Sequence, residues 1–279
     1  MGKSARDRHS VLRCMELWTF LSQNPVSLLE RWTQQTPWGG KSLSSKIAAP
    51  APTRMISVII PAHNEADYLG PTLRSIQAQN YGWYEVIVVA NGCRDGTAAV
   101  ARGQCHRLVV LPQRNLGLAR NLGARLARGE ILLFLDADTT LESCALRRIV
   151  EEFTPVDAAG TLKGRPDRPR WAYRMIYALK NLVHCARLHP GSSGAILCWK
   201  KYFVLAGGFD EGLQVRENSE LLRRLRRFGR YKYLGGVAAT TSMRRYEQRG
   251  FWRVVWLWIK LWFESLVRDL HQRPYEVVR

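Results

Sequence analysis

Long apolar runs are missing from this sequence. Its 279 residues include no uncharged apolar stretch of the about 20 residues that a membrane-spanning helix needs. The nearest candidate, residues 251–267, is interrupted by Arg253, Lys260 and Glu264. The first residues lack an apolar segment followed by a small-residue cleavage site, so we expect no secretory signal. Their excess of basic residues fits a transit peptide, and a true start at Met55 is the alternative.

Cysteine and histidine are also scarce. The six cysteines form no C-x-x-C pair or metal-finger spacing, and the six histidines are scattered without ligand spacing. These absences argue against zinc fingers and disulfide scaffolds, and they predict reduced, mostly buried thiols in a cytoplasmic protein. The sequence also has no G-x-S-x-G and no P-loop, which argues against α/β-hydrolases and P-loop nucleotidases.

Acidic residues are far fewer than basic residues. The chain has 42 Lys and Arg against 23 Asp and Glu, a formal net charge of +19. We therefore expect anionic partners, which include nucleotides, phosphates, acidic lipids and nucleic acid. Residues 221–279 alone hold fourteen basic and four acidic residues. The positive charge is thus concentrated at the C-terminal end.

The hydrophobic pattern divides the chain into three parts. Residues 36–54 are rich in Gly, Ser and Pro, so we expect 1–54 to be a poorly ordered N-terminal extension and linker. A folded domain is expected over 55–246, followed by a Trp- and Arg-rich amphipathic helical tail over 247–279. With 46% hydrophobic residues, the chain can bury a sizeable core.

Within the domain, short β-branched runs alternate with helix-like segments. Strands are predicted at 56–60, 85–89, 108–111 and 131–135, with helices at 66–79, 96–103 and 116–128. Because these strands are apolar on both faces, they predict a mostly parallel sheet with helices on both faces, an α/β nucleotide-binding layout. Farther along we expect helices at 141–153, 171–186 and 217–228, a basic loop at 163–170 and a strand at 195–199.

The tail is amphipathic when it is drawn as a helix. Its charged residues fall on one narrow face, and large apolar residues, including Trp252, Trp256, Trp258 and Trp262, cover the rest. Such a helix suits a lipid headgroup interface, where an indole ring lies in the apolar layer and its N–H stays near water. Packing on its own domain or in a homodimer is the alternative.

The strongest chemical signal is a buried strand, Leu132–Leu135, that leads into Asp136, Ala137 and Asp138. In an extended chain the two carboxylates point the same way, so they can share one hard divalent cation at the carboxyl edge of the sheet. Taken alone the D-x-D pattern is weak, because it also caps helices.

Other motifs stand around this pair in a fixed order. They are Ser57–Glu65, Glu85–Thr97, Arg114–Gly123, Gly207–Glu211 and the segment from Glu217 through Gly229. The series resembles the family 2 glycosyltransferases of GT-A fold, over about residues 55–246. The resemblance implies transfer of a sugar from a nucleotide diphosphate donor, with inversion and without a covalent intermediate. It also implies that Asp136 and Asp138 hold Mg²⁺ or Mn²⁺, which stabilises the departing diphosphate; zinc does not suit these oxygen ligands.

The resemblance also suggests donor-binding residues. These are Pro61, Ala62, His63, Asn64, Glu65, Asn91, Arg120, Asp136, Ala137, Asp138, Arg244 and Arg245. The segment 61–65 is expected to form a turn that holds the base or ribose, and Asn91 to contact the base edge. Arg120 would orient the ribose or the aspartate loop unless it is a solvated helix residue. Arg244 and Arg245 would bind the diphosphate unless they form a plain basic surface.

Two departures from the family pattern stand out. Ala90 and Asn91 occupy positions where many members have acidic residues, which leaves the nucleobase open. The usual Glu-Asp pair, whose Asp is the base, here reads Glu217-Asn218, and an amide does not accept a proton. Three outcomes follow: Glu217 or Glu220 is the base, the acceptor needs none, or the protein is inactive. A phosphate acceptor needs no base, so we expect a polyprenyl phosphate or glycolipid.

Two other functional classes compete with this interpretation. An inactive GT-A-fold protein that binds anionic membrane or nucleic acid fits the charge and Asn218. A nucleotidyltransferase would need a Gly-rich basic loop where this chain has 61–65. Under the main interpretation the protein binds a nucleotide-diphospho-sugar and makes peripheral contact with the cytoplasmic face of the membrane. No nucleic-acid partner is expected.

Overall fold

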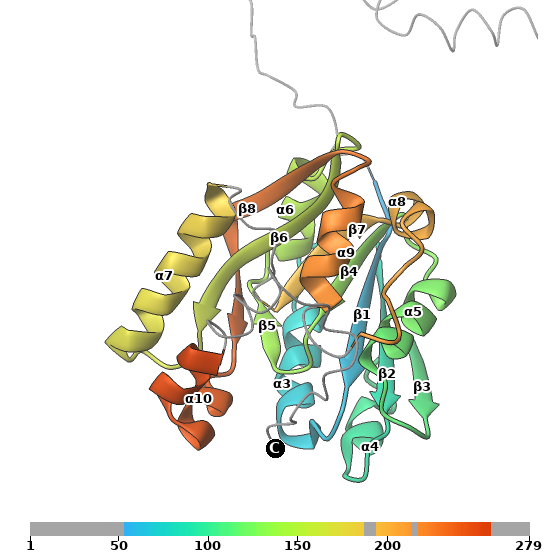
Figure 1. Cartoon of the computed structure of the whole chain (residues 1–279). Coiled ribbons are helices and arrows are strands. Elements are labelled where there is room, and N and C mark those ends of the chain that lie inside the picture. The colour runs from blue at the N-terminus through green and yellow to red at the C-terminus, as the bar shows by residue number, and fades with distance from the viewer. Residues whose placement is uncertain (1–52, 187–193, 214–216, 258–279) are drawn as a thin grey trace, which may run out of the picture. The chain divides into compact units, whose positions relative to one another are not determined.

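The computed structural model describes residues 53–186, 194–213 and 217–257. These residues build an eight-stranded sheet in the order β3-β2-β1-β4-β7-β6-β8-β5 (Figure 1). The expected extension over 1–54 lies outside the described residues except for its last two, and the expected tail is described only to residue 257.

The sheet is mixed, with a parallel half that contains the predicted strands. Its strands are β1 (Ile56–Ala62), β2 (Tyr84–Asn91), β3 (Arg107–Leu111), β4 (Ile131–Leu135), β5 (Thr139–Leu141), β6 (Asp157–Pro166), β7 (Ala195–Trp199) and β8 (Arg230–Thr241). Strands β3, β2, β1 and β4 run parallel, and β7 is antiparallel to both β4 and β6. Every residue of β1, β4 and β7 is buried, as expected for strands covered on both faces.

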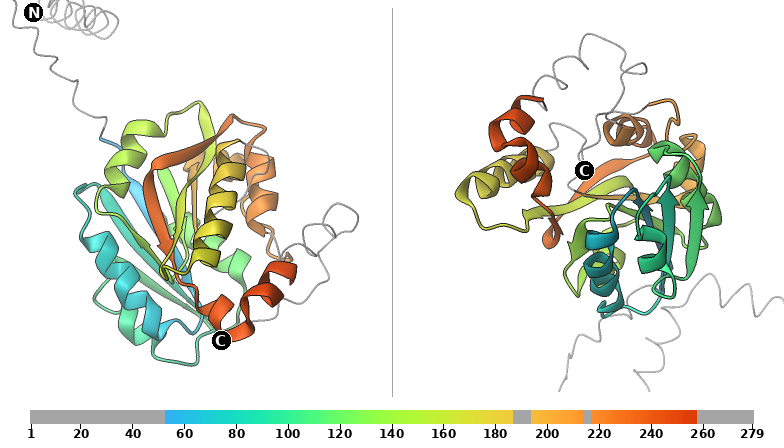
Figure 2. Two further views of the ribbon diagram at one scale, coloured as in Figure 1. Left: turned by 90° about the vertical axis from the view of Figure 1, so that its left-hand side faces the viewer. Right: turned by 90° about the horizontal axis from the view of Figure 1, so that it is seen from below.

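Helices cover both faces of the sheet (Figure 2). They are α3 (Ala66–Gln77), α4 (Thr97–Ala101), α5 (Leu116–Leu126), α6 (Ala145–Glu152), α7 (Trp171–Cys185), α8 (Lys200–Leu205), α9 (Glu217–Leu225) and α10 (Arg244–Arg249). Alternation along β4 serves both layers: Leu133 and Leu135 pack with α3 and α6, whereas Leu132 and Phe134 pack with α5, α8 and α9.

Parts of the second half, and the burial of the cysteines, differ from the prediction. The expected basic loop 163–170 is partly strand, because β6 extends through Pro166 and pairs with β8, which was not predicted. The expected helix 141–153 begins only at Ala145, because Thr139–Leu141 pairs with β8 as β5. The thiols are less buried than expected: among the described cysteines only Cys198 is buried.

The C-terminal described segment packs on α7. Val254, which lies in a helical stretch over 251–257, is buried in a cluster with Tyr173 and Tyr177 of α7 and with Met243 and Tyr246. No helix among the described residues is both long and apolar enough to span a bilayer. The remainder of the predicted tail helix, from residue 258, lies outside the described residues.

Candidate active site

The two aspartates lie at the carboxyl edge of the parallel strands, in a turn directly after β4. The segment is not extended as expected: the backbone N–H of Thr139 donates to the Asp136 carbonyl at 3.1 Å and closes a turn. Asp136 N–H donates to the Gly194 carbonyl at 2.9 Å, and the Thr72 hydroxyl donates to the Ala137 carbonyl at 2.8 Å. Ala137 therefore holds the turn by its backbone, and the flanking carboxylates stay near each other.

Arg120 joins the aspartate turn to helix α9. Its Nη2 lies 3.3 Å from Asp136 Oδ1, its Nη1 lies 2.9 Å from Glu217 Oε1, and its guanidinium lies 5.0 Å from the centre of the Phe209 ring. Only 3% of the Arg120 residue is exposed. This excludes a solvated arginine and agrees with the expectation that Arg120 orients the aspartate loop.

The electrostatics of Asp136 oppose its ionisation. Burial raises the pKa of the Asp136 carboxyl to about 6; the Arg120 charge opposes this shift, and the Asp138 and Glu217 carboxylates add to it. Burial likewise raises the pKa of Asp138, with Arg244 acting in the opposite direction. The Arg245 charge lowers the pKa of both aspartates, so Arg245 also acts on the turn. Two ionised carboxylates without a positive partner are therefore unfavourable here, and a cationic ligand would stabilise them.

Asp136→Asn should become more stable relative to wild type as pH rises. A carboxyl whose pKa rises on folding stabilises the fold below its unfolded pKa and loses that contribution as pH rises through the folded pKa, here about 6. Because 42% of the Asp136 side chain is exposed, solvent screening limits this change in the difference in unfolding free energy between variant and wild type to about 1 kcal/mol. Urea unfolding of both proteins in the presence of a chelator, at about pH 4 and pH 7, measures the difference. A difference that does not change with pH would contradict the raised pKa.

The segment 61–65 delivers Glu65 to the same edge. Pro61 and Ala62 belong to β1 rather than to the expected turn, which starts at His63. Asn64 has φ of 53°, a left-handed conformation that Asn tolerates better than most residues, and its Oδ1 accepts from Arg94 N–H at 2.8 Å. The turn therefore reverses the chain sharply before α3.

Arg244 binds the second aspartate and Glu65 together. Its Nη2 donates to Glu65 Oε1 and lies 3.5 Å from Asp138 Oδ2, while its guanidinium stacks 4.1 Å from the centre of the Tyr68 ring. Burial raises the pKa of Glu65, and the Arg244 hydrogen bond opposes that rise. The other Glu65 oxygen, Oε2, is buried without a hydrogen-bond partner among the described residues. Such an atom is a ready acceptor for a ligand.

Asn91 and His63 stabilise the loops beside the site. The Asn91 side-chain oxygen accepts from Asn115 N–H at 2.8 Å, and its backbone carbonyl accepts from His63 Nδ1 at 2.7 Å. Asn91 therefore uses part of its hydrogen-bonding capacity inside the fold, where the sequence predicted a contact to a base. His63 thus makes an ordinary side-chain hydrogen bond to the backbone at the end of β2.

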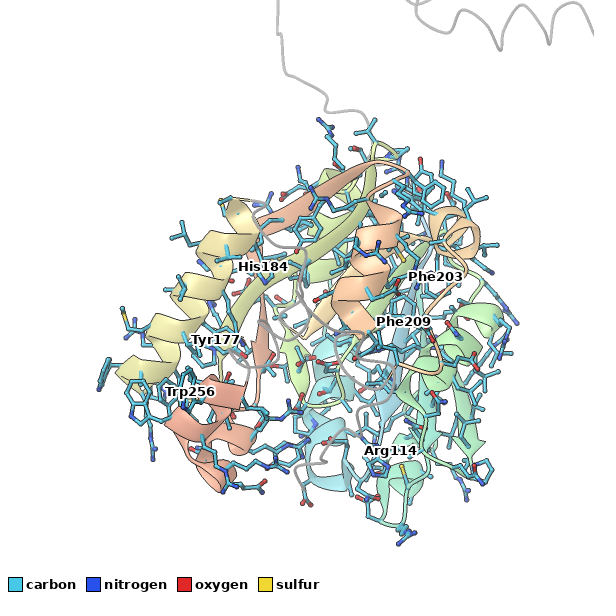
Figure 3. The ribbon with its side chains drawn as sticks, viewed as in Figure 1. Arg114, Tyr177, His184, Phe203, Phe209 and Trp256 are labelled. Atoms are coloured by element: carbon cyan, nitrogen blue, oxygen red, sulfur yellow. The ribbon has the colours of Figure 1, made fainter. Side chains whose placement is uncertain are left out.

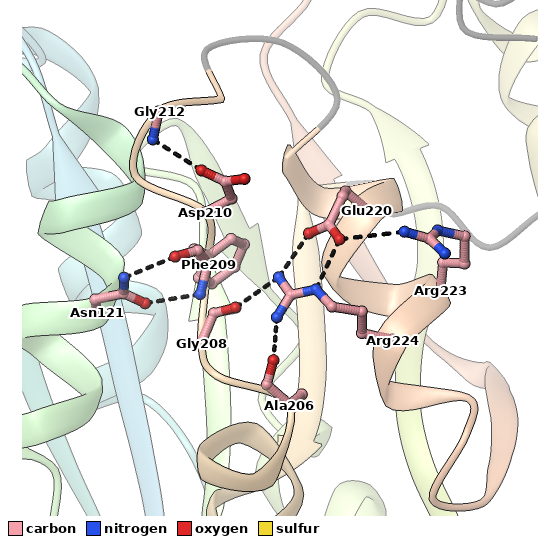
Figure 4. Close-up of polar contacts among 9 residues, drawn as sticks. All are labelled: Asn121, Ala206, Gly208, Phe209, Asp210, Gly212, Glu220, Arg223 and Arg224. Carbon is pink, nitrogen blue, oxygen red and sulfur yellow. Dashed lines mark hydrogen bonds and ion pairs between the residues drawn. The ribbon is translucent and has the colours of Figure 1, made fainter. Parts of the chain in front are cut away.

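The three candidates on α9 have different environments. Glu217 is buried and paired with Arg120, and Asn218 follows it in the first turn. Glu220 instead pairs with Arg224 through Nε at 2.7 Å and Nη2 at 2.6 Å (Figure 4). Arg224 also donates to the Ala206 and Gly208 carbonyls. The Glu220 carboxylate thus fixes Arg224, which in turn binds the segment before α9, and the role of Glu220 as an alternative base stays a prediction.

The residues present fit a hard divalent cation only in part. Asp136 and Asp138 supply carboxylate oxygens at an edge where a diphosphate would complete the coordination, which suits Mg²⁺ or Mn²⁺. No group of three or more His, Cys, Asp or Glu side chains with metal-binding geometry occurs in the described part of the chain. Both carboxylates contact arginines, so a cation would have to exchange with these contacts.

Four contributors to the site were missed from sequence. Tyr68 stacks on Arg244, Phe209 packs against Arg120, Thr72 holds Ala137, and Gly194 binds Asp136. Gly194 has φ of +83°, and an added Cβ would lie 2.6 Å from Thr139 Oγ1, so a larger residue is excluded. Phe209 lies inside a motif that the sequence did single out; the other three carry no local signal.

Comparison with known proteins shows what the chain is similar to. A family model described as Glycosyl transferase family 2 matches residues 57–188, which include β1, the segment 61–65, Arg120 and both aspartates. Over these residues the chain is similar to glycosyl transferase family 2. Glycosyltransferase AglE of Haloferax volcanii is 37% identical over 115 residues, 38% of each protein. A PGL/p-HBAD biosynthesis glycosyltransferase of Mycobacterium tuberculosis is 29% identical over 222 residues, 73% of this chain and 85% of the relative.

Solved structures of similar proteins have the same fold. Mannosyltransferase PcManGT from Pyrobaculum calidifontis, solved with GDP-Man and Mn²⁺, has a TM-score of 0.57 and 22% identity, covering 82% of this chain and 68% of that one. TarS residues 1–349 of S. aureus, solved with UDP, has a TM-score of 0.54 and 20% identity, covering 68% and 60%. The GT-A fold is therefore shown. The matches to AglE and to an uncharacterized Nostoc glycosyltransferase cover 38% and 35% of those relatives' lengths.

Proposed function

We propose that this protein transfers a sugar from a nucleoside diphosphate donor to an acceptor, with inversion at the anomeric carbon. The observation that carries the proposal is the convergence of Asp136, Asp138 and Glu65 with the buried Arg120 and the partly buried Arg244 at the carboxyl edge of the parallel strands. Family relatives and neighbours solved with nucleotide sugars support the reaction class.

Each group of residues at the site has its own proposed role. Arg244 and Arg245 lie where a diphosphate would approach the aspartate turn, and guanidinium groups bind such oxygens in bidentate fashion. A divalent cation held by Asp136 and Asp138 would stabilise the charge on the leaving diphosphate. Arg120 would hold the aspartate turn in position through its contact with Asp136. Residues 61–65 and Asn91 border the donor side, where the base and ribose would lie.

The acceptor is proposed to be a lipid-linked phosphate. Asn218 replaces the family's base, and the neighbouring Glu217 is held by Arg120 at 2.9 Å. A phosphate oxygen is already ionised near neutral pH and attacks without a general base, whereas a sugar hydroxyl requires one. A polyprenyl phosphate therefore matches this α9 better than a soluble sugar.

Glu217→Gln should change kcat with a polyprenyl phosphate acceptor by less than about tenfold, because no proton is removed there. If Glu217 is the base, kcat should fall by about 10² to 10⁴. Glu220→Gln, which removes a carboxylate bound by Arg224, is the matched control. Steady-state kinetics with polyprenyl phosphate and with a soluble sugar alcohol distinguish these cases; product only from the alcohol would refute the phosphate acceptor.

The donor is tested by a thermal-shift panel of UDP, GDP, CDP and dTDP sugars, each with and without Mn²⁺. A ligand at about a hundredfold its Kd should stabilise the fold by about 2.7 kcal/mol. We expect Mn²⁺-dependent stabilisation by one nucleotide. Stabilisation by none would contradict the proposal and favour a non-catalytic member of the family.

A further inference from the structure

Helix α7 carries a stripe of exposed apolar side chains. Trp171, Met175, Leu179 and Leu182 are 76%, 63%, 60% and 64% exposed. At 100° per residue these four positions fall within an arc of about 80°. Isolated exposed apolar residues are ordinary, but several exposed large apolar side chains on one helix face are typical of an interaction surface.

The helical stretch 251–257 adds to this stripe. Trp252 and Trp256 are 75% and 70% exposed, while Val254 between them is buried against the α7 cluster. The Phe251 ring packs on Tyr173 of α7, with centroids 5.7 Å apart. Trp256 lies beside the N-terminal end of α7 (Figure 3). We name the exposed set the aromatic face; it consists of Trp171, Met175, Leu179, Leu182, Trp252 and Trp256.

A basic cavity adjoins the aromatic face. It has a volume of about 610 Å³, lies between the end of β6 and α7, and is lined by four cationic side chains and one carboxylate. The cationic side chains are Lys163, Arg165, Arg168 and Arg174. Arg165 pairs with Glu142 and Arg168 with Glu247, whereas no ion pair of Lys163 or Arg174 occurs within the described residues.

The cavity and the stripe share α7. Arg174, Ala178 and Asn181 line the cavity from the helix face next to Trp171 and Met175. Cationic groups and large apolar groups therefore meet along one side of the molecule. The exposed Arg253, between the two tryptophans, adds a further charge.

We propose that this side of the protein binds the surface of a membrane that contains anionic phospholipids. The aromatic face enters the interfacial layer, and lipid phosphates occupy the basic cavity. A second copy of the chain is a poorer occupant, because pairing the face with itself would bring two basic cavities together. The proposal uses none of the donor-site residues and does not depend on sugar transfer.

The contact would also place the candidate active site near the lipid. Arg244 binds Glu65 and Asp138, and it opens the helix α10. Tyr246 of α10 packs on Tyr173 of α7, with ring centroids 5.8 Å apart. The aspartate turn and the membrane-facing helix are thus joined by one short packed segment.

Cosedimentation of the full chain with vesicles tests the proposal without any donor. We expect binding to vesicles of phosphatidylcholine with about a third phosphatidylglycerol, and little binding to phosphatidylcholine alone. Trp252→Ser/Trp256→Ser should weaken binding by about tenfold or more. Trp83→Ser is the matched control, because Trp83 is 61% exposed and precedes β2, outside the aromatic face. Equal binding by the double variant and wild type would overturn the proposal.

A second pair of variants tests the cavity. Lys163→Gln/Arg174→Gln should weaken binding to the anionic vesicles by about tenfold, and Arg102→Gln/Arg125→Gln, at exposed positions outside the cavity, should not. Equal losses in both double variants would show that only net charge acts, which would refute the cavity's part. If the tryptophan variant instead dissociates an oligomer in light scattering and leaves vesicle binding intact, the face is a self-association surface and the proposal is wrong.

Discussion

Asp138→Asn is expected to lower kcat/KM for sugar transfer by about 10³-fold. The reason is electrostatic: an asparagine amide is a weaker ligand for a divalent cation than a carboxylate, and under the proposed function that cation stabilises the leaving diphosphate. The substitution preserves the shape of the turn, whose backbone carbonyl at 138 accepts from Ser242 N–H at 3.1 Å. Kinetics with the donor that the thermal-shift panel identifies measure the effect.

Binding provides a second measurement of the same change. Mn²⁺-dependent stabilisation by the nucleoside diphosphate should disappear in Asp138→Asn. Asp67→Asn is the matched control, because Asp67 is an exposed carboxylate in the first turn of α3. Full activity and unchanged Mn²⁺ dependence in Asp138→Asn would remove Asp138 from the site.

Arg120→Met should destabilise the fold by about 3 kcal/mol. Removing one partner of a buried ion pair leaves the opposite charge without compensation, which typically costs about 3–5 kcal/mol. Arg120 faces two carboxylates, and the buried Glu217 suffers more from its loss than Asp136, which keeps 42% of its side chain exposed. Chemical denaturation of the two proteins measures the difference.

A double variant separates this explanation from simple loss of packing. In Arg120→Met/Glu217→Gln the Glu217 carboxylate, which would have lost its Arg120 partner, is replaced by a neutral amide. Part of the lost free energy of unfolding should therefore return. Equal stability of the single and double variants would mean that the methionine side chain, rather than the uncompensated carboxylate, causes the loss.

The parallel half of the sheet was predictable because its strands are continuous apolar runs. Residues 131–135 match the prediction at both ends, and β1 and β2 extend it by only a few residues. Strand β6 was not recognised because it reads Asp-Ala-Ala-Gly-Thr-Leu-Lys-Gly-Arg-Pro, with small residues, two glycines and a proline of low strand propensity. Its pairing with β8 overrides that propensity, and such tertiary pairing leaves no local signal.

The candidate residues were easier to find than their contacts. The motifs singled out Arg120, Glu65, Asp136, Asp138 and Arg244, which the structure brings to one edge. The pairs they form were not predictable, because Arg244 and Glu65 are 179 positions apart and Glu217 and Arg120 are 97 apart. Glu220 and Glu217 are equivalent by residue type, and only the position of Arg224 separates them.

The guanidinium groups of Arg120 and Arg244 have a consequence for how the protein matures. They already offset the negative charge of the aspartate turn from within the chain. We therefore expect the turn to fold without a metal ion, unlike small domains whose apo forms are unstructured. Under the proposed function, newly made protein would reach its final shape in a cell that is short of metal and would bind a divalent cation later, together with the nucleotide.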